Sequence, residues 1–344
     1  MRFPQIWLVV IVSFAANSSF ALDPESPQDI EYPQVQACAF LSNKLLCTSI
    51  PSGREHSSAM RCWDVSTGRE IEPFGAKPRT SSYGFAVSRD GKYLAAMTDG
   101  GIGVWDLSKP QPYPKVSTLK FNGTAFDFIG DTNKLATVNY KKLQIIELPS
   151  KIIATTAFPF DPTSLDVSPD GKLLASHSHI FEMEKQQEVA TTEASEEVYV
   201  PPVFSPDGKY LAYGTFKELV VWDIANRRSL FRKESRRVLP DDEKAAGFAD
   251  IDTPGPIVWT PDGKALVTRN IADQLHIVDS RTGDFKEHVF RDKFIANCYA
   301  YSPDGQHLAV TGSFPEGPTA IRIKNLKTDK VTTIKLDPFP KKVK

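Results

Sequence analysis

The sequence carries almost no excess of charge of either sign. Its 344 residues include 41 lysines and arginines against 42 aspartates and glutamates, a formal net charge of −1. A protein that binds nucleic acid or an acidic membrane surface through its overall field needs a clear basic excess. We therefore expect no nucleic-acid partner.

The sequence also lacks an apolar run of the roughly 20 residues that a bilayer-spanning helix requires. The longest run, residues 6–16, follows a positively charged start and precedes small residues at Ser19 and Ala21. This order is typical of a cleaved secretory signal peptide, with an uncleaved membrane anchor as the alternative. We predict a signal peptide over residues 1–21 and an exported protein, periplasmic or secreted, with no membrane span after its removal.

Catalytic and cofactor signatures are absent as well. The chain has no Gly-x-Ser-x-Gly, His-Glu-x-x-His, phosphate loop or dinucleotide fingerprint. His177 and His179 stand two apart, as a metal pair on one face of a strand would, but no third ligand follows at a recognisable spacing. Asp250 and Asp252 lack the spacing of a calcium loop. We expect no cofactor, no metal and no catalytic residue.

The sequence does have one short turn, many times over. Residues 205–212 read Ser-Pro-Asp-Gly-Lys-Tyr-Leu-Ala. Related strings, two of them decayed, recur at 41–46, 88–95, 130–136, 168–175, 260–267 and 302–309. Pro presets φ, Asp bonds its own backbone and Gly accepts a positive φ, so the string predicts a tight turn. The flanking residues are strand-like, and each copy therefore predicts a hairpin.

A third strand follows each hairpin at a repeatable distance. It ends in a Trp-Asp pair at Trp63, Trp105 and Trp222, and Trp105 and Trp222 each lie 13 residues after the turn lysine of their unit. The fourth unit has no such pair, and we expect Met183 to take the Trp position. A polar turn and a fourth strand come next, as at 330–336. Units of four strands, 37 to 55 residues apart, are typical of propeller blades.

The five clear turns and three Trp-Asp pairs resemble the WD-repeat β-propeller family over residues 36–337. The resemblance implies an all-β, seven-bladed β-propeller of four-stranded antiparallel blades. The Gly-His dipeptide of that family is missing before the first strands, and the Ser-Pro-Asp-Gly turn is also similar to TolB-like and lactonase-type propellers. Residues 22–35 are then a proline-rich leader, and residues 338–344 a basic tail.

Closure of the predicted ring concerns its first and last blades. The last unit owns a fourth strand, so we expect the two blades to meet through side chains rather than through a shared strand. Three of the four cysteines, Cys38, Cys47 and Cys62, lie in the first unit and Cys298 in the last. An even number in an exported protein permits disulfides, and the three pairings stay open. A Cys38–Cys298 bridge would tie the ring together, and buried free thiols are the alternative.

Insertions fall at one end of the predicted blades. In a four-strand meander the first-to-second and third-to-fourth turns share one end, called here the turn face, and the other connections share the loop face. The three long insertions, within 50–60, 232–256 and 313–318, all belong to the loop face. Loops on a rigid scaffold are where binding concentrates, although exposed loops also tolerate neutral insertion.

The candidate partner-binding residues are the charged and aromatic side chains of these loops. They are Arg54, Glu55, His56, Phe314, Glu316, Arg236, Arg237, Asp241 and Asp242. The leading hypothesis is a non-catalytic exported scaffold that binds a protein through the loop face. A propeller enzyme of lactonase or hydrolase type, with residues at the mouth of the central channel, is the alternative, and a structural envelope component is a third.

Overall fold

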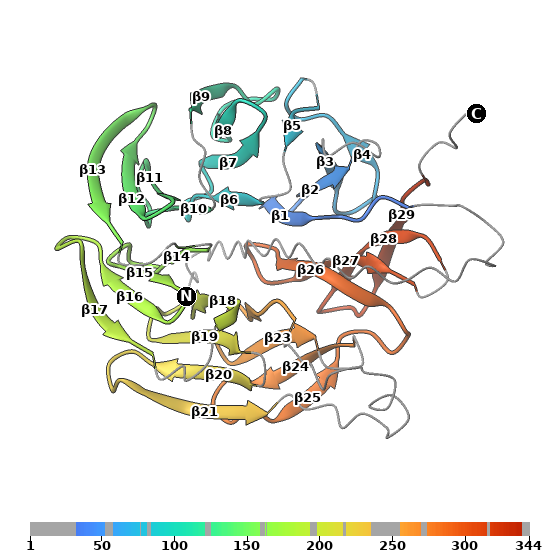
Figure 1. The fold of residues 1–344 in the computed structure, drawn as a ribbon. Helices are drawn as coiled ribbons and strands as arrows, with labels where there is room; N and C mark the ends of the chain where they lie inside the picture. The colour runs from blue at the N-terminus through green and yellow to red at the C-terminus, as the bar shows by residue number, and fades with distance from the viewer. Residues whose placement is uncertain are drawn as a thin grey trace, which may run out of the picture.

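The chain folds as a seven-bladed all-β propeller, which confirms the predicted fold class (Figure 1). The computed structural model describes residues 32–51, 58–75, 77–80, 84–120, 125–158, 162, 164–192, 198–215, 218–234, 255–269, 274–314 and 317–338. Each blade is an antiparallel sheet of four sequential strands, and the first blade has a short additional strand. Among the described residues, no helix is long and apolar enough to cross a membrane.

The strands of the first four blades follow one another along the chain. Blade 1 contains β1 (Ala37–Ser42), β2 (Leu45–Pro51), β3 (Ser58–Asp64), β4 (Glu70–Ile71) and β5 (Arg79–Thr80). Blade 2 contains β6 (Phe85–Val87), β7 (Tyr93–Thr98), β8 (Gly101–Asp106) and β9 (Lys115–Leu119). Blade 3 contains β10 (Ala125–Phe128), β11 (Lys134–Asn139), β12 (Lys142–Glu147) and β13 (Lys151–Ala157). Blade 4 contains β14 (Asp166–Val167), β15 (Leu173–Ser176), β16 (His179–Glu182) and β17 (Gln187–Thr191).

The last three blades continue the order. Blade 5 contains β18 (Val198–Phe204), β19 (Tyr210–Thr215), β20 (Glu218–Asp223) and β21 (Arg228–Glu234). Blade 6 contains β22 (Val258–Trp259), β23 (Ala265–Arg269), β24 (Leu275–Asp279) and β25 (Phe285–His288). Blade 7 contains β26 (Ile295–Tyr301), β27 (His307–Ser313), β28 (Thr319–Asn325) and β29 (Val331–Lys335). The first strand of each blade lies toward the centre of the ring and the last toward its rim (Figure 1).

The register of the blades follows the repeat. The leucine after each turn pairs with the Trp position of the third strand, as Leu94 does with Trp105 and Leu211 with Trp222. The fourth blade corrects one prediction, because Leu174 pairs with Phe181, so that Phe181 and not Met183 holds the Trp position. His177 lies in the turn before β16 with a φ of 51°, which removes the predicted strand pair of histidines.

The core consists of apolar layers between adjacent blades. Trp222 and Trp259 are 1% and 0% exposed, so both rings pack inside the protein. The indole of Trp259 in blade 6 donates to the carbonyl oxygen of Val203 in blade 5 at 3.1 Å. Two such blades therefore share both an apolar layer and a hydrogen bond.

Blades 1 and 7 close the ring without exchanging a strand, as expected from the sequence. They lie side by side, blue next to red, in Figure 1. One apolar cluster spans them and contains Val35, Phe40, Leu46 and Trp63 from the beginning of the chain and Ile321 from its end. Val35 is the last residue of the predicted leader, so the described end of the leader packs against this seam. The predicted signal peptide, the rest of the leader and most of the basic tail lie outside the described residues.

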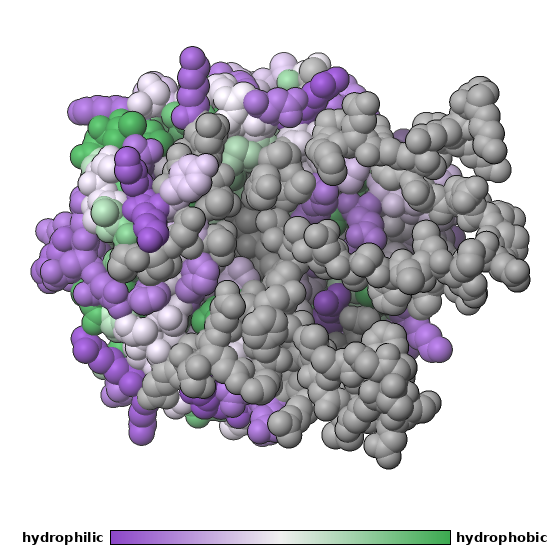
Figure 2. All heavy atoms as spheres, viewed as in Figure 1, coloured by the Kyte–Doolittle hydropathy of each residue, from purple (hydrophilic) through white to green (hydrophobic). Residues whose placement is uncertain are grey.

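The rim of the ring is mainly hydrophilic in the view of Figure 2, and the largest apolar region lies at its upper left. Val116 on β9 and Ile152 and Ile153 on β13 are 38%, 53% and 40% exposed. Green spheres in Figure 2 lie over this part of the rim. The outer strands of blades 2 and 3 thus present apolar side chains to solvent.

Candidate functional site

The recurring turn is held by a hydrogen-bond network in which its first residue is central. The hydroxyl of Ser205 donates to the Asp207 carboxylate at 2.7 Å and accepts the Tyr210 N–H at 2.9 Å. The same carboxylate accepts the Lys209 N–H at 3.1 Å. Corresponding bonds occur in the turns that begin at Ser88, Ser168, Thr260 and Ser302. A side chain that satisfies two strand ends at once explains why Ser or Thr opens every clear copy.

The turns also abut one another around the axis and form a collar. A Cβ added to Gly305 would lie 2.9 Å from Pro261 Cγ, and one added to Gly208 would lie 3.4 Å from Pro169 Cδ. Gly305 thus has no room for a side chain and Gly208 is in contact with the neighbouring turn, and both have a positive φ, which favours glycine. At the seam, Asp304 donates its backbone N–H to the Asn43 side chain at 3.0 Å. The turns therefore define a continuous edge on the turn face.

One residue of this collar departs from the repeat. Arg89 occupies the place that proline holds in the turns of blades 4 to 7. Its guanidinium reaches from blade 2 to blade 5 and donates to the carbonyl oxygen of Pro206 at 3.4 Å. Burial lowers the pKa of Arg89, and the charges of Asp131 and Asp170 oppose this shift. Arg89 is therefore a half-buried cation that crosses the ring within the collar.

A cavity of about 1000 Å³ opens on the turn face over blades 5 to 7. Its lining consists of turn residues of these blades, namely Pro206, Asp207, Tyr210, Pro261, Asp262, Gly263, Lys264, Asp279, Ser280, Arg281, Lys286, Pro303 and Asp304. A second cavity of about 520 Å³ shares Pro261, Asp262 and Asp304 with it and continues toward blade 7. The two cavities form a recess at least as large as ordinary ligand pockets.

Arg281 is the distinctive group in this recess. Its guanidinium stacks over the Tyr210 ring at 4.6 Å from the centroid and donates to the Tyr210 hydroxyl at 2.8 Å. The two lysines of the lining pair locally, Lys264 with Asp262 at 3.8 Å and Lys286 with Asp279 at 3.0 Å. Arg281 forms no ion pair within the part of the chain that the structure describes, although it is exposed. A positioned guanidinium with unused donors suits a carboxylate, which it can bind in a bidentate manner.

Two carboxylates form a second polar feature, on the innermost strands of blades 3 and 4. Asp127 accepts the backbone N–H of Val167 at 3.2 Å, and Asp166 accepts that of Phe204 at 2.7 Å, so each reaches the next blade. Burial raises the pKa of Asp127 to about 7, and burial together with the charge of Asp127 raises that of Asp166. One carboxyl of the pair is thus able to hold a proton near neutral pH.

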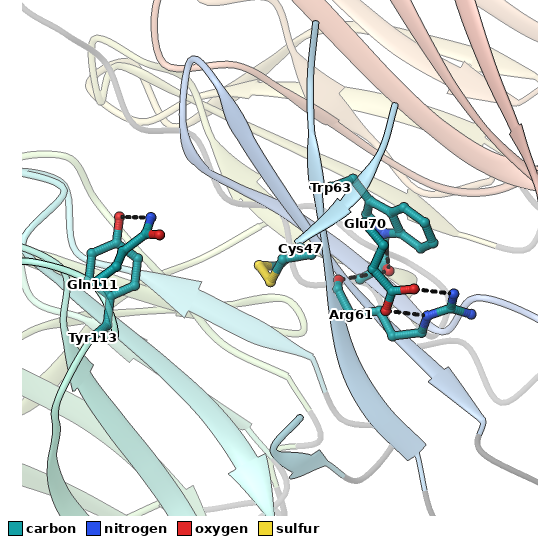
Figure 3. The surroundings of a disulfide bond; sticks show 8 residues. Cys47, Arg61, Trp63, Glu70, Gln111 and Tyr113 are labelled. Atoms are coloured by element: carbon teal, nitrogen blue, oxygen red, sulfur yellow. Dashed lines mark hydrogen bonds and ion pairs between the residues drawn. A yellow bond between two sulfur atoms is a disulfide. The ribbon is translucent and has the colours of Figure 1, made fainter. Parts of the chain in front are cut away.

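The disulfide of the structure joins Cys47 and Cys62, whose Cα atoms are 4.1 Å apart. Figure 3 shows it between the Arg61–Glu70 pair and the Gln111–Tyr113 pair. Arg61 donates two hydrogen bonds to Glu70, at 2.9 and 2.6 Å, and so lowers the pKa of that carboxyl.

Cys38 and Cys298 are both buried free thiols in this structure, which is one of the alternatives that the sequence left open. The register of blade 1 places Cys47 on β2 directly opposite Cys62 on β3 and so selects that pair for the disulfide.

Most of the predicted partner-binding residues are not placed by the structure. Arg54, Glu55, His56, Arg236, Arg237, Asp241, Asp242 and Glu316 lie outside the described residues. Phe314 is described; it is half-buried, and its ring packs edge-on against Phe294 with the centroids 5.1 Å apart. The structure therefore gives Phe314 a packing role and leaves the loop face as a hypothesis.

Sequence reasoning missed Arg89 and the recess around Arg281 on the turn face, and it did not select the Cys47–Cys62 pair within the strands of blade 1. Arg89 carried a signal, because it replaces proline in an otherwise regular turn. Cys47 and Cys62 carried one too, since they directly follow and precede the paired residues Leu46 and Trp63. The cavity around Arg281 had no sequence signal, because it is formed by turns of three different blades. No group of three or more His, Cys, Asp or Glu side chains with metal-binding geometry occurs in the described ranges.

Comparison with known proteins gives short and weak likenesses. No family model matches the chain. A probable dipeptidyl-peptidase 5 of Aspergillus clavatus is 34% identical over 118 residues, which are 33% of this chain and 15% of that protein. Dipeptidyl-peptidase 5 of Aspergillus fumigatus is 28% identical over 188 residues, 45% of this chain and 25% of that protein. A 66 kDa stress protein of Physarum polycephalum is 24% identical over 174 residues, 48% of this chain and 29% of that protein.

These matches cover less than a third of each relative's length. The propeller fold that the WD-repeat resemblance implies is present, while membership of that family is not shown. The peptidase names point mildly toward enzymes.

Proposed function

We propose that the chain is an exported, non-catalytic binding module that captures a protein partner on its ring. The observation that carries this proposal is the recess over blades 5 to 7, where Arg281 is stacked on Tyr210 and free to bind a carboxylate. A rigid ring holds such groups in place before binding, which lowers the ordering cost of association. The partner would present an acidic side chain or a C-terminal carboxylate to Arg281.

The test is capture of the partner from extracts by the immobilised chain, compared among charge-reversed variants. Arg281→Glu is expected to lose at least tenfold in affinity, because it removes the donors and adds a repulsive charge. Arg69→Glu is the matched control, since Arg69 is an exposed arginine in the equivalent turn of blade 1. Loss of capture only in an Arg236→Glu/Arg237→Glu variant would move the site to the loop face, and capture that survives all of these changes would overturn the proposal.

A second candidate function is a hydrolase of the propeller type. It is supported by the names of the two dipeptidyl-peptidase relatives and by the raised pKa of Asp127, since a group with a pKa near 7 is suited to general acid–base work. Purified chain would be assayed against chromogenic dipeptide and lactone substrates. Turnover that disappears in Asp127→Asn and persists in Arg281→Glu would favour this candidate over the binding module.

A further inference from the structure

Within the residues that the structure describes, the seam between blades 1 and 7 is held by noncovalent contacts. Each of the other blade junctions is crossed by the chain itself, whereas blades 1 and 7 share neither a strand nor a connection. One apolar cluster and the Asp304–Asn43 hydrogen bond join them. The seam is therefore the place where the ring can open with no change in the sheets.

Two thiols face each other across this seam. Cys38 lies on β1 and Cys298 on β26, the innermost strands of the two blades, and these two strands pack against each other. They are 3% and 5% exposed and belong to the same apolar cluster. The Sγ atom of Cys298 also lies 2.9 Å from the Thr311 hydroxyl. The thiols thus meet in a dry site that joins the beginning of the ring to its end.

The other cysteines cannot take part in this pair without unfolding the blade. Cys47 pairs with Ala39, the neighbour of Cys38, and successive residues of a strand point to opposite faces. Cys47 and Cys62 accordingly belong to the apolar cluster shared with blade 2, while Cys38 belongs to the cluster shared with blade 7. The sheet of blade 1 separates the existing disulfide from the thiol pair.

We propose that Cys38 and Cys298 are a second disulfide site, whose oxidation closes the ring covalently between its first and last blades. The oxidant is a disulfide, either that of a thiol–disulfide oxidoreductase or glutathione disulfide. One thiolate attacks it to form a mixed disulfide, and the second thiolate then displaces the remaining thiol. The protein loses two protons and two electrons as the Sγ–Sγ bond forms, and the oxidant is reduced to two thiols.

The burial of the two thiols determines when this oxidation can occur. The contact with Cys298 and burial raise the pKa of the Cys38 thiol, so little thiolate exists in the closed ring. We therefore place the oxidation at folding, or at a transient opening of the seam, when the oxidant reaches the thiols. A bridge formed at this stage links Cys38 to Cys298, which are 260 positions apart in the chain. It therefore restricts the unfolded chain over most of its length.

The first experiment counts free thiols in the full chain after refolding with a glutathione redox pair. The protein is denatured without reductant, alkylated and digested, and its peptides are analysed by mass spectrometry. A linked peptide pair containing Cys38 and Cys298 is expected in addition to the pair containing Cys47 and Cys62. Full alkylation of Cys38 and Cys298 would overturn the proposal, and so would linkage of either one to Cys47 or Cys62.

The second experiment measures what the bridge does. Oxidised wild type is expected to unfold roughly 5–10 °C above oxidised Cys298→Ser, which retains the Cys47–Cys62 disulfide. The conservative replacement keeps the hydrogen bond with Thr311 available. Oxidised Cys38→Ser is expected to lose the same increment as Cys298→Ser, and the Cys38→Ser/Cys298→Ser double variant to lose little more than either single one, because the bridge is already absent from each. Equal midpoints in all samples would contradict a locking role.

Discussion

Arg89 in the second blade donates a hydrogen bond to the carbonyl oxygen of Pro206 in the fifth, across the ring. The two residues are 117 positions apart in the chain and occupy the same position in their respective turns. In blade 2, the position that holds proline in blades 4 to 7 thus holds an arginine, whose side chain joins two distant blades at the collar.

Replacing Arg89 by alanine is expected to lower the free energy of unfolding by about 1 kcal/mol, the usual net value of one hydrogen bond with some lost packing. Lys172→Ala is the matched control, because Lys172 is an exposed turn residue of blade 4 and should be neutral within about 0.5 kcal/mol. Urea denaturation followed by tryptophan fluorescence measures both. An unchanged midpoint for Arg89→Ala would show that the cross-ring bond contributes nothing.

Ser205→Ala tests the network of the turn. Ser205 is 1% exposed and accepts the Tyr210 N–H, so its loss leaves that N–H without its acceptor, while the exposed Asp207 keeps the bond from the Lys209 N–H. We expect a loss of about 1–2 kcal/mol in equilibrium denaturation. Ser205→Thr should be tolerated, because Thr260 makes the same bonds in blade 6. Equal losses in both variants would indicate a steric cause instead.

Asp127 predicts a pH dependence of stability. Its folded pKa, about 7, lies above the ordinary value of 3.8, so the folded state holds a proton that the unfolded state has released between these values. Stability from this group is therefore fully present below about pH 4 and is lost as the pH rises toward 7.

Between pH 4.5 and 7.5, the free energy of unfolding of wild type is expected to fall by about 1–2 kcal/mol more than that of Asp127→Asn. This is less than the full pKa shift implies, because the Asp127 side chain retains some solvent exposure. Denaturant titrations of the two proteins at several pH values give this difference directly. Parallel stability curves would mean that Asp127 is ionised in the folded protein throughout this range.

The Cys47–Cys62 disulfide should stabilise the first blade. It closes a separation of 15 residues, for which the loss of unfolded-state entropy is worth about 3 kcal/mol. A Cys47→Ala/Cys62→Ala variant is expected to show this loss in denaturant titration, with near-native circular dichroism. A difference below about 1 kcal/mol would assign the bond no stabilising role.

The sequence predicts what repeats. Turn strings and Trp-Asp pairs gave the blades, their strands and the register, because a turn and a buried aromatic leave local signals. The fourth blade shows the limit, since Phe181 is one apolar residue among several and the spacing alone favoured Met183. Differences in loop length likewise show where residues are inserted. They do not indicate which side chains of the turn face, where the turns have a constant length, form a site.

Contacts between blades could not be predicted from the sequence for a different reason. The recess around Arg281 and the bond between Arg89 and Pro206 depend on the angles at which distant units meet. No local pattern encodes those angles. The contact between Cys38 and Cys298 is the exception, because closure of a ring necessarily brings its first and last inner strands together.

The contact between turn glycines and prolines also bears on the size of the ring. Gly305 rests so closely on Pro261 that a methyl group would have to push the two turns apart. A side chain at this position would therefore widen the ring between blades 6 and 7 as well as strain its own hairpin.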